Sequence, residues 1–153
     1  MKSIVVDTNI VFSAFLNLDS KIGQILLNGH NSFIFYAPEY IKTELLEHKE
    51  KIKKIGKLSD LVFDELYNMI LSRLNIISNS SIPTEFYQSA FLVCKDIDLD
   101  DITFVAASKF LNAHLWTGDL KLVRELITKD YKNIMTTKDM YFEYLIGNNL
   151  SEN

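Results

Sequence analysis

The segment SIVVDTNIVFSAFL, residues 3–16, decides the fold class of this chain. Residues 3–6 form a short β-branched run that ends at the carboxylate of Asp7, a pattern typical of a buried strand. From residue 10 to residue 16 the apolar spacing becomes that of a helix. A buried strand that feeds directly into a helix is the first unit expected of an α/β domain.

The same alternation of strand and helix continues along the chain. Further strands are expected at residues 33–36, 75–77, 114–116 and 133–135. Helices are expected at residues 21–27, from Pro38 through Glu47 or His48, at 61–71, from Pro83 to near Lys95, from the acid cluster at 98–101 through 111, at 119–127 and at 137–145. Alternating strands and helices imply right-handed crossovers and a mostly parallel sheet that is covered on both faces.

Composition limits the organisation and the compartment. With 153 residues, of which 48% are hydrophobic, the chain predicts one domain over residues 1–147 and a frayed tail at 148–153. The only cysteine, Cys94, stands in an apolar run and is expected to be a buried thiol, so no internal disulfide can form and the cytoplasm is the expected compartment. Asp7 and Asn9 interrupt the apolar N-terminal stretch, which argues against a signal peptide, and no membrane span is expected.

The net charge of the chain limits how it could bind nucleic acid. The formal net charge of −4 argues against binding nucleic acid through broad neutralisation of its backbone, which needs an excess of Lys and Arg. It leaves open an enzyme in which bound metal ions supply positive charge locally.

Carboxylates follow two of the expected strands. Asp7 lies just past the first strand and Asp119 just past the fourth. Ligands bind at the carboxyl ends of the strands of a parallel sheet, so these two acids can converge although they are distant in sequence. Convergence of carboxylates predicts a metal site.

Two further groups of acids have competing interpretations. The cluster DLDD, residues 98–101, stands at an expected helix start, where acids commonly serve as caps; Asp98 suits the N-cap, which leaves Asp101 free to point into the groove. Glu44 lies in the helix after the second strand, where a glutamate usually belongs to a solvated face. His48 could share the face of Glu44, but an exposed histidine beside a lysine is more often inert.

Taken together, four motifs resemble those of a PIN-domain nuclease. They are VVDTNIV at residues 5–11, the helix containing Glu44, DLDD followed by FVAAS at 104–108, and LWTGD at 115–119. The resemblance implies a three-layer α/β/α sandwich with a mostly parallel central sheet and an acidic pocket that binds Mg²⁺ or Mn²⁺ and cuts RNA. Many small members are VapC-like toxins of toxin–antitoxin pairs, so the resemblance also implies a homodimer and an antitoxin partner.

The family's functional residues match positions in this chain. Asp7, Glu44, Asp101 and Asp119 match the catalytic acids, and Asp98 belongs to an acidic lead-in that some members have. Asp7, Asp101 and Asp119 are then expected to ligate the metal, and Glu44 to orient the attacking water or ligate a second ion. Asp98 is either an auxiliary ligand or a helix cap.

Substrate binding must come from outside the acids. The lysine-rich stretch at 42–57, including Lys42, is one candidate, and Lys121 and Arg124 beside Asp119 are another. Lysines on amphipathic helices also serve solubility, and both interpretations stay open. Because residues 49–57 lengthen and charge the region after Glu44, the subfamily and the toxin assignment are left open.

Two other interpretations compete with the metal-dependent endoribonuclease. One is a catalytically silent PIN-like module that binds RNA or protein; the presence of all four acids disfavours it. The other is a receiver-like domain with an acidic Mg²⁺ pocket, which the TGD ending at residues 117–119 fits poorly.

Overall fold

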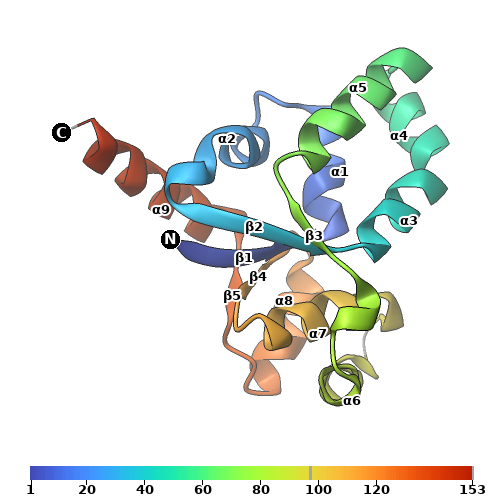
Figure 1. Cartoon of the computed structure of the whole chain (residues 1–153), viewed down its shortest axis with the longest axis vertical. Helices are drawn as coiled ribbons and strands as arrows, with labels where there is room; N and C mark the ends of the chain where they lie inside the picture. Colours follow the sequence, from blue (N-terminus) through green and yellow to red (C-terminus); the bar gives the residue numbers. More distant parts are fainter. Residues whose placement is uncertain (97, 153) are drawn as a thin grey trace.

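The computed structural model describes residues 1–96 and 98–152, which form an α/β/α sandwich around one sheet (Figure 1). In chain order its elements are β1 (Lys2–Val6), α1 (Thr8–Leu16), α2 (Lys21–Asn28), η1 (Gly29–Asn31), β2 (Phe33–Pro38), α3 (Tyr40–Glu47), α4 (Lys49–Gly56), α5 (Asp60–Leu71), β3 (Asn75–Ile77), η2 (Asn79–Ser81), α6 (Thr84–Cys94), η3 (Leu99–Asp101), α7 (Ile102–Phe110), β4 (His114–Trp116), α8 (Leu120–Thr128), β5 (Ile134–Met135) and α9 (Thr137–Ser151). The predicted fold class is confirmed.

The sheet has five strands in the order β3-β2-β1-β4-β5, and every neighbouring pair is parallel. The chain moves outward from β1 to β2 and β3, then returns to the other side of β1 for β4 and β5. The strand order therefore reverses between β1 and β4. The carboxyl ends of these two strands form the crevice in which α/β folds bind ligands.

Helices cover both faces of the sheet (Figure 1). Helices α1, α2 and α9 lie on one face, and α1 also packs against the lobe formed by α3, α4 and α5. Helices α6, α7 and α8 lie on the other face, where α7 packs on β1, β2 and β4. Because β1 is covered on both sides, Ile4, Val5 and Val6 are all fully buried, as expected for a central parallel strand.

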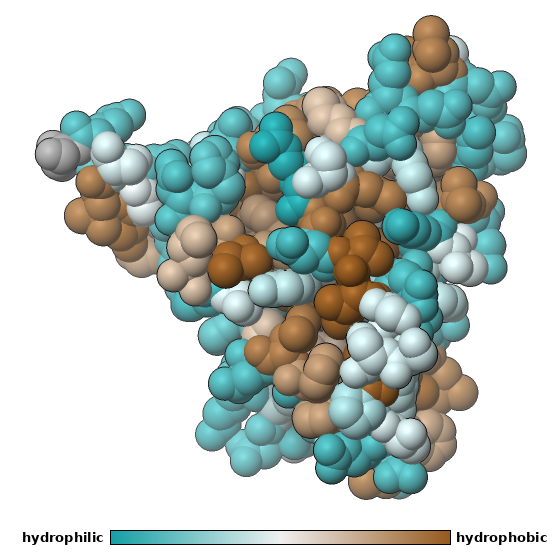
Figure 2. Space-filling view, viewed as in Figure 1, coloured by the Kyte–Doolittle hydropathy of each residue, from teal (hydrophilic) through white to brown (hydrophobic). Residues whose placement is uncertain are grey.

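The inner strand β4 and the edge strand β3 differ in their exposure. Trp116 on β4 is fully buried, and its indole Nε1 donates to Thr137 Oγ1 at 3.1 Å, which satisfies its only donor. In contrast, β3 is an edge strand, on which Ile76 and Ile77 are half-buried. Figure 2 shows several apolar side chains near the middle of the face that carries β3, interspersed with hydrophilic ones.

Several element boundaries differ from the sequence-based expectation. Pro38 was expected to open a helix but ends β2, paired with Ile77, and α3 begins at Tyr40. The amide of Glu39 donates to Ile77 O at 2.8 Å, so the ladder continues past the residue that lacks a donor. The helix expected from the acid cluster is divided into η3 and α7.

The last helix is longer than expected. Its predicted end was Leu145, but α9 runs to Ser151 from a capping box formed by Thr136 and Asp139. The fraying predicted for residues 148–153 concerns motion and stays a prediction; Asn153 lies outside the described residues. Cys94 is buried, as expected.

No helix in the described ranges is by itself long and apolar enough to cross a membrane. The bent pair formed by α1 and residues 21–31 meets that criterion by length and composition, with an angle of 106° between its halves.

Candidate metal centre

Asp7 is the first residue after β1, and its side chain is held from three directions. It is only 5% exposed and serves as the N-cap of α1, where its Oδ1 accepts from Thr8 N at 2.8 Å. Its Oδ2 accepts from Thr117 Oγ1 at 2.8 Å and from Asn9 Nδ2 at 3.2 Å. The pairing of Val6 with Trp116 places Asp7 beside Thr117. The switch point of the sheet therefore fixes this carboxylate.

Glu44 reaches the same place from α3. Its Oε1 accepts a hydrogen bond from Thr8 Oγ1 at 2.8 Å. The residue after Asp7 thus connects the acid of α3 to the acid of β1. Glu44 is half-buried, which distinguishes it from the exposed Glu47 on the same helix.

The acid cluster supplies the opposite wall of the pocket through η3. Asp98 Oδ1 accepts from Asp100 N at 3.0 Å, so Asp98 caps this short turn and also lines the pocket. Asp101 ends the turn and is more buried than Asp98 and Asp100, both of which are exposed. Asp98 therefore both caps η3 and lines the pocket.

Asp119 lies next to this group, outside the residues that line the pocket. Its Oδ1 caps α8 by accepting from Lys121 N at 3.0 Å and Leu122 N at 3.2 Å. Its own amide donates to Thr117 Oγ1 at 3.1 Å, the same hydroxyl that donates to Asp7. The charge of Asp119 still raises the pKa of both Asp7 and Asp101, which shows that the three acids are electrostatic neighbours.

The pocket between these walls has a volume of about 350 Å³. The residues that line it are Asp7, Thr8, Asn9, Phe12, Glu44, His48, Lys51, Asp98, Asp100 and Asp101. They come from the end of β1, from α1, from the α3–α4 region and from the segment that leads into α7. Acids that are far apart in sequence share one hollow.

Burial and mutual repulsion disfavour ionisation of these acids. Burial raises the pKa of Asp7 to about 6, and the charge of Asp119 adds to the rise against hydrogen bonds from Thr117 and Thr8. Burial, followed by the charges of Asp7 and Asp100, raises the pKa of Glu44 to about 7 against the bond from Thr8.

Asp101 shows the largest rise of the three. Burial and the negative charges of Asp7, Asp98, Asp119 and Glu44 raise its pKa to about 8. Its Oδ2 is buried and has no hydrogen-bond partner among the residues that the structure describes. A cation would relieve the repulsion and satisfy this oxygen.

The donor set fits a hard divalent cation such as Mg²⁺ or Mn²⁺, since every candidate ligand is a carboxylate oxygen. Within residues 1–96 and 98–152, however, no three acidic, histidine or cysteine side chains form a closed ligand set for one ion. Mg²⁺ commonly binds through one or two carboxylates and keeps several waters. The pocket suits such open coordination better than a cage made only of protein atoms.

Three of the predicted substrate-binding cations do not line this pocket, whereas Lys51 of the predicted tract at 42–57 does. Lys42, Lys121 and Arg124 are exposed and are not among the residues that line the pocket. His48 and Lys51 do line it, although the sequence indicated an inert His48 and gave no reason to select Lys51 from the lysine tract. The sequence offered Asp98 as a ligand or a helix cap but gave no role to Asp100, and both line the pocket.

These observations define the class of protein: an α/β/α domain with an acidic pocket at the switch point of a parallel sheet. The model of the PIN domain family matches residues 5–142, and the chain therefore belongs to the PIN domain family. Members of this family are generally nucleases.

Solved structures show the same fold at low sequence identity. VapBC2 from Rickettsia felis, bound to a DNA fragment from its promoter, has a TM-score of 0.65 at 20% identity and covers 88% of this chain and 96% of that one. PAE2754 from Pyrobaculum aerophilum has a TM-score of 0.68 at 12% identity, covering 95% and 90%. A toxin–antitoxin complex from Klebsiella pneumoniae has a TM-score of 0.59 at 15% identity, covering 88% and 97%. No curated protein matches the chain significantly.

Proposed function

We propose that this protein is a divalent-metal-dependent endoribonuclease that hydrolyses phosphodiester bonds in RNA. The observation that carries the proposal is the pocket itself, in which Asp7, Glu44 and Asp101 meet from separate elements at the carboxyl edge of the sheet. Membership of the PIN domain family supports nuclease chemistry at this position.

The acids have different proposed roles. Asp7 and Asp101 hold Mg²⁺ or Mn²⁺ directly or through water, with Asp98 at the rim and Asp119 contributing through its charge and through water. Glu44, held by Thr8, orients the attacking water. The bound ion supplies positive charge beside the scissile phosphate and lowers the pKa of coordinated water.

The clustering of partly buried acids in the pocket disfavours the alternative of a catalytically silent module. A module that had lost its chemistry would have no need to keep several acids together where burial and repulsion raise the pKa of three of them. Here Asn9 and Thr117 hold Asp7 in the pocket, although isolated burial of a carboxylate is unfavourable.

Cleavage of single-stranded RNA tests the proposal. Purified wild-type protein is expected to cut it with Mn²⁺ or Mg²⁺ and to stop when a chelator is added. Asp7→Asn should lower the rate at least about 100-fold, because a direct ligand matters at least as much as the groups that orient ligands. Asp130→Asn is a matched control, since Asp130 is exposed and has a φ of 62°, which asparagine readily adopts. Unchanged cleavage by Asp7→Asn would refute the site assignment.

We further propose that the protein is the toxin of a toxin–antitoxin pair and forms a homodimer. The structural likeness to the Rickettsia felis and Klebsiella pneumoniae proteins supports a protein partner. Light scattering on the isolated chain, whose mass is 17.7 kDa, should give twice that value. A monomer at micromolar concentration would contradict the dimer.

A further inference from the structure

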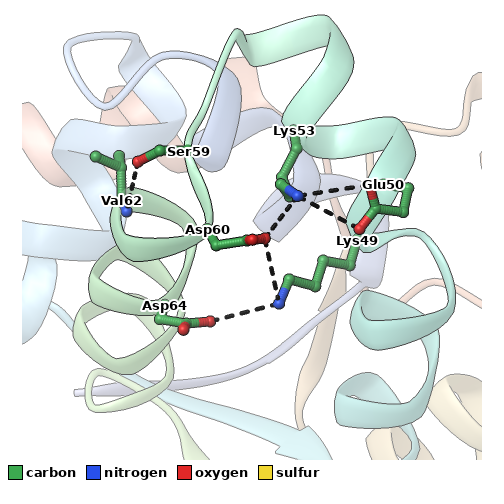
Figure 3. Close-up of polar contacts among 7 residues, drawn as sticks. All are labelled: Lys49, Glu50, Lys53, Ser59, Asp60, Val62 and Asp64. Carbon is green, nitrogen blue, oxygen red and sulfur yellow. Dashed lines mark hydrogen bonds and ion pairs between the residues drawn. The ribbon is translucent and has the colours of Figure 1, made fainter.

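The lysines of α4 fall into two groups with different surroundings. Lys49 and Lys53 are one helical turn apart and face α5 (Figure 3). Lys49 Nζ lies 3.8 Å from Asp60 Oδ1 and 3.7 Å from Asp64 Oδ1. Lys53 Nζ lies 2.6 Å from Asp60 Oδ1. These two lysines therefore hold α4 against α5 and have their charges paired.

Lys51 points the other way. It lies two residues from both Lys49 and Lys53, about 200° around the helix from each. Its side chain lines the acidic pocket, with Nζ 6.0 Å from the centre of the Phe12 ring. Among the described residues no carboxylate lies within ion-pair distance of Lys51, so its charge is available to a ligand.

The packing of α4 fixes the position of this charge. Ile52, the next residue, is fully buried, and α4 packs on α1, the helix that begins directly after Asp7. Phe12, beneath Lys51, belongs to α1 as well. The packing of α4 on α1 therefore positions Lys51 relative to Asp7, the N-cap of α1.

Lys51 places a positive charge beside a pocket that is otherwise strongly negative. Five carboxylates line the pocket, and RNA is a polyanion, so its backbone is repelled wherever no cation faces it. Apart from His48, Lys51 is the one basic residue among the described residues that line the hollow. Resting on the function proposed above, we infer that Lys51 binds a backbone phosphate of RNA next to the scissile one. It thereby sets the register of the strand across the acids.

RNA binding can be measured separately from cleavage in the Asp7→Asn background, by fluorescence anisotropy with a labelled single-stranded oligonucleotide at several salt concentrations. Adding Lys51→Gln should weaken binding about two- to fivefold, whatever the RNA sequence, as expected for one exposed ionic contact. The slope of log K against log salt should fall in magnitude by about 0.7, the value for one phosphate contact on a single strand.

Lys54→Gln is the matched control, because Lys54 is an exposed lysine of the same helix that does not line the pocket. It makes the same change in net charge and should alter affinity and salt slope less than Lys51→Gln does. Lys51→Arg should restore both. In the otherwise wild-type enzyme, Lys51→Gln should raise KM and leave kcat nearly unchanged, which a purely structural role would not do.

The outcomes separate this inference from the proposed function. If the wild-type enzyme cleaves RNA and Lys51→Gln behaves like Lys54→Gln in affinity and salt slope, the role of Lys51 is refuted while the nuclease stands. If the wild-type enzyme neither cleaves nor binds RNA with any divalent cation, the proposed function fails, and this inference fails with it.

Discussion

Replacing Asp7 by asparagine should stabilise the fold while it removes the activity. The pKa of Asp7 rises from 3.8 to about 6, and each pKa unit corresponds to about 1.4 kcal/mol, so the ionised carboxylate costs the folded state about 3 kcal/mol at neutral pH. Asparagine removes this cost. Its amide nitrogen cannot accept from Asn9 Nδ2, a loss of about 1 kcal/mol or slightly more, whereas the Thr117 hydroxyl that now donates to this oxygen can rotate and accept from the new N–H. The net gain in unfolding free energy is about 1–2 kcal/mol.

The pH dependence has a definite sign. Between pH 3.8 and about 6 the unfolded chain releases the Asp7 proton while the folded chain keeps it, so this residue lowers stability as pH rises through that window. Near pH 4 the folded state keeps its proton and the unfolded state is partly protonated, so most of the advantage of asparagine should disappear.

Thermal unfolding in the presence of a chelator measures the difference. At pH 7.5 Asp7→Asn should raise Tm by about 2–8 °C, and near pH 4 the two proteins should melt together or the variant slightly earlier. Asp98→Asn is the control, since Asp98 is exposed and asparagine caps a helix as well as aspartate does. A lower Tm for Asp7→Asn at pH 7.5, or an equal gain at both pH values, would refute the account of a strained carboxylate.

Three other predictions follow from single contacts. Gly23→Ala should destabilise the fold by about 1–3 kcal/mol in denaturant titrations, because the new Cβ would lie 2.1 Å from the backbone oxygen of Leu18; an unchanged midpoint would contradict this close approach. Thr8→Val removes the hydrogen bond that lowers the pKa of Glu44 and should move the acidic limb of the pH–rate profile to higher pH, whereas an unmoved limb would show that Glu44 does not control it. Cys94, buried and with a pKa raised to about 11, should react with a thiol reagent at pH 8 only after unfolding, and fast labelling of the native protein would disprove its burial.

The sequence alone predicted the framework of the site because that framework depends on local patterns. Residues 4–6 before Asp7 are continuously apolar, and the apolar pair Leu115–Trp116 comes directly before Thr117; buried apolar residues of this kind are expected in central parallel strands. Once both strands were assigned, the switch-point rule brought Asp7 and the TGD motif to the same edge.

The parts that the sequence did not predict depend on tertiary packing. Residues 49–56 have the composition of a solvated lysine tract, and the sequence alone predicts no helix or strand there. They form α4 because Ile52 is buried among neighbouring helices and because Lys49 and Lys53 pair with acids of α5. The selection of Lys51 as a pocket residue follows from that packing. A run of lysines in the sequence does not show which ones are already paired.

Asp119 illustrates the same limit at the level of one side chain. The strand-end rule places its backbone correctly, but its carboxylate caps α8 and does not line the pocket. Asp7 and Asp98 also cap helices and do line the pocket, so a predicted cap position does not by itself show whether a carboxylate faces the pocket.

Diffraction from crystals soaked in Mn²⁺, collected near the manganese absorption edge, is the most direct test that these acids act together on a divalent ion. We expect an anomalous peak in the pocket next to the carboxylates of Asp7 and Asp101, and its loss in Asp7→Asn crystals soaked in the same way. An ordered pocket in the wild-type protein with no peak at high Mn²⁺ concentration, or a peak that persists unchanged in the variant, would contradict it.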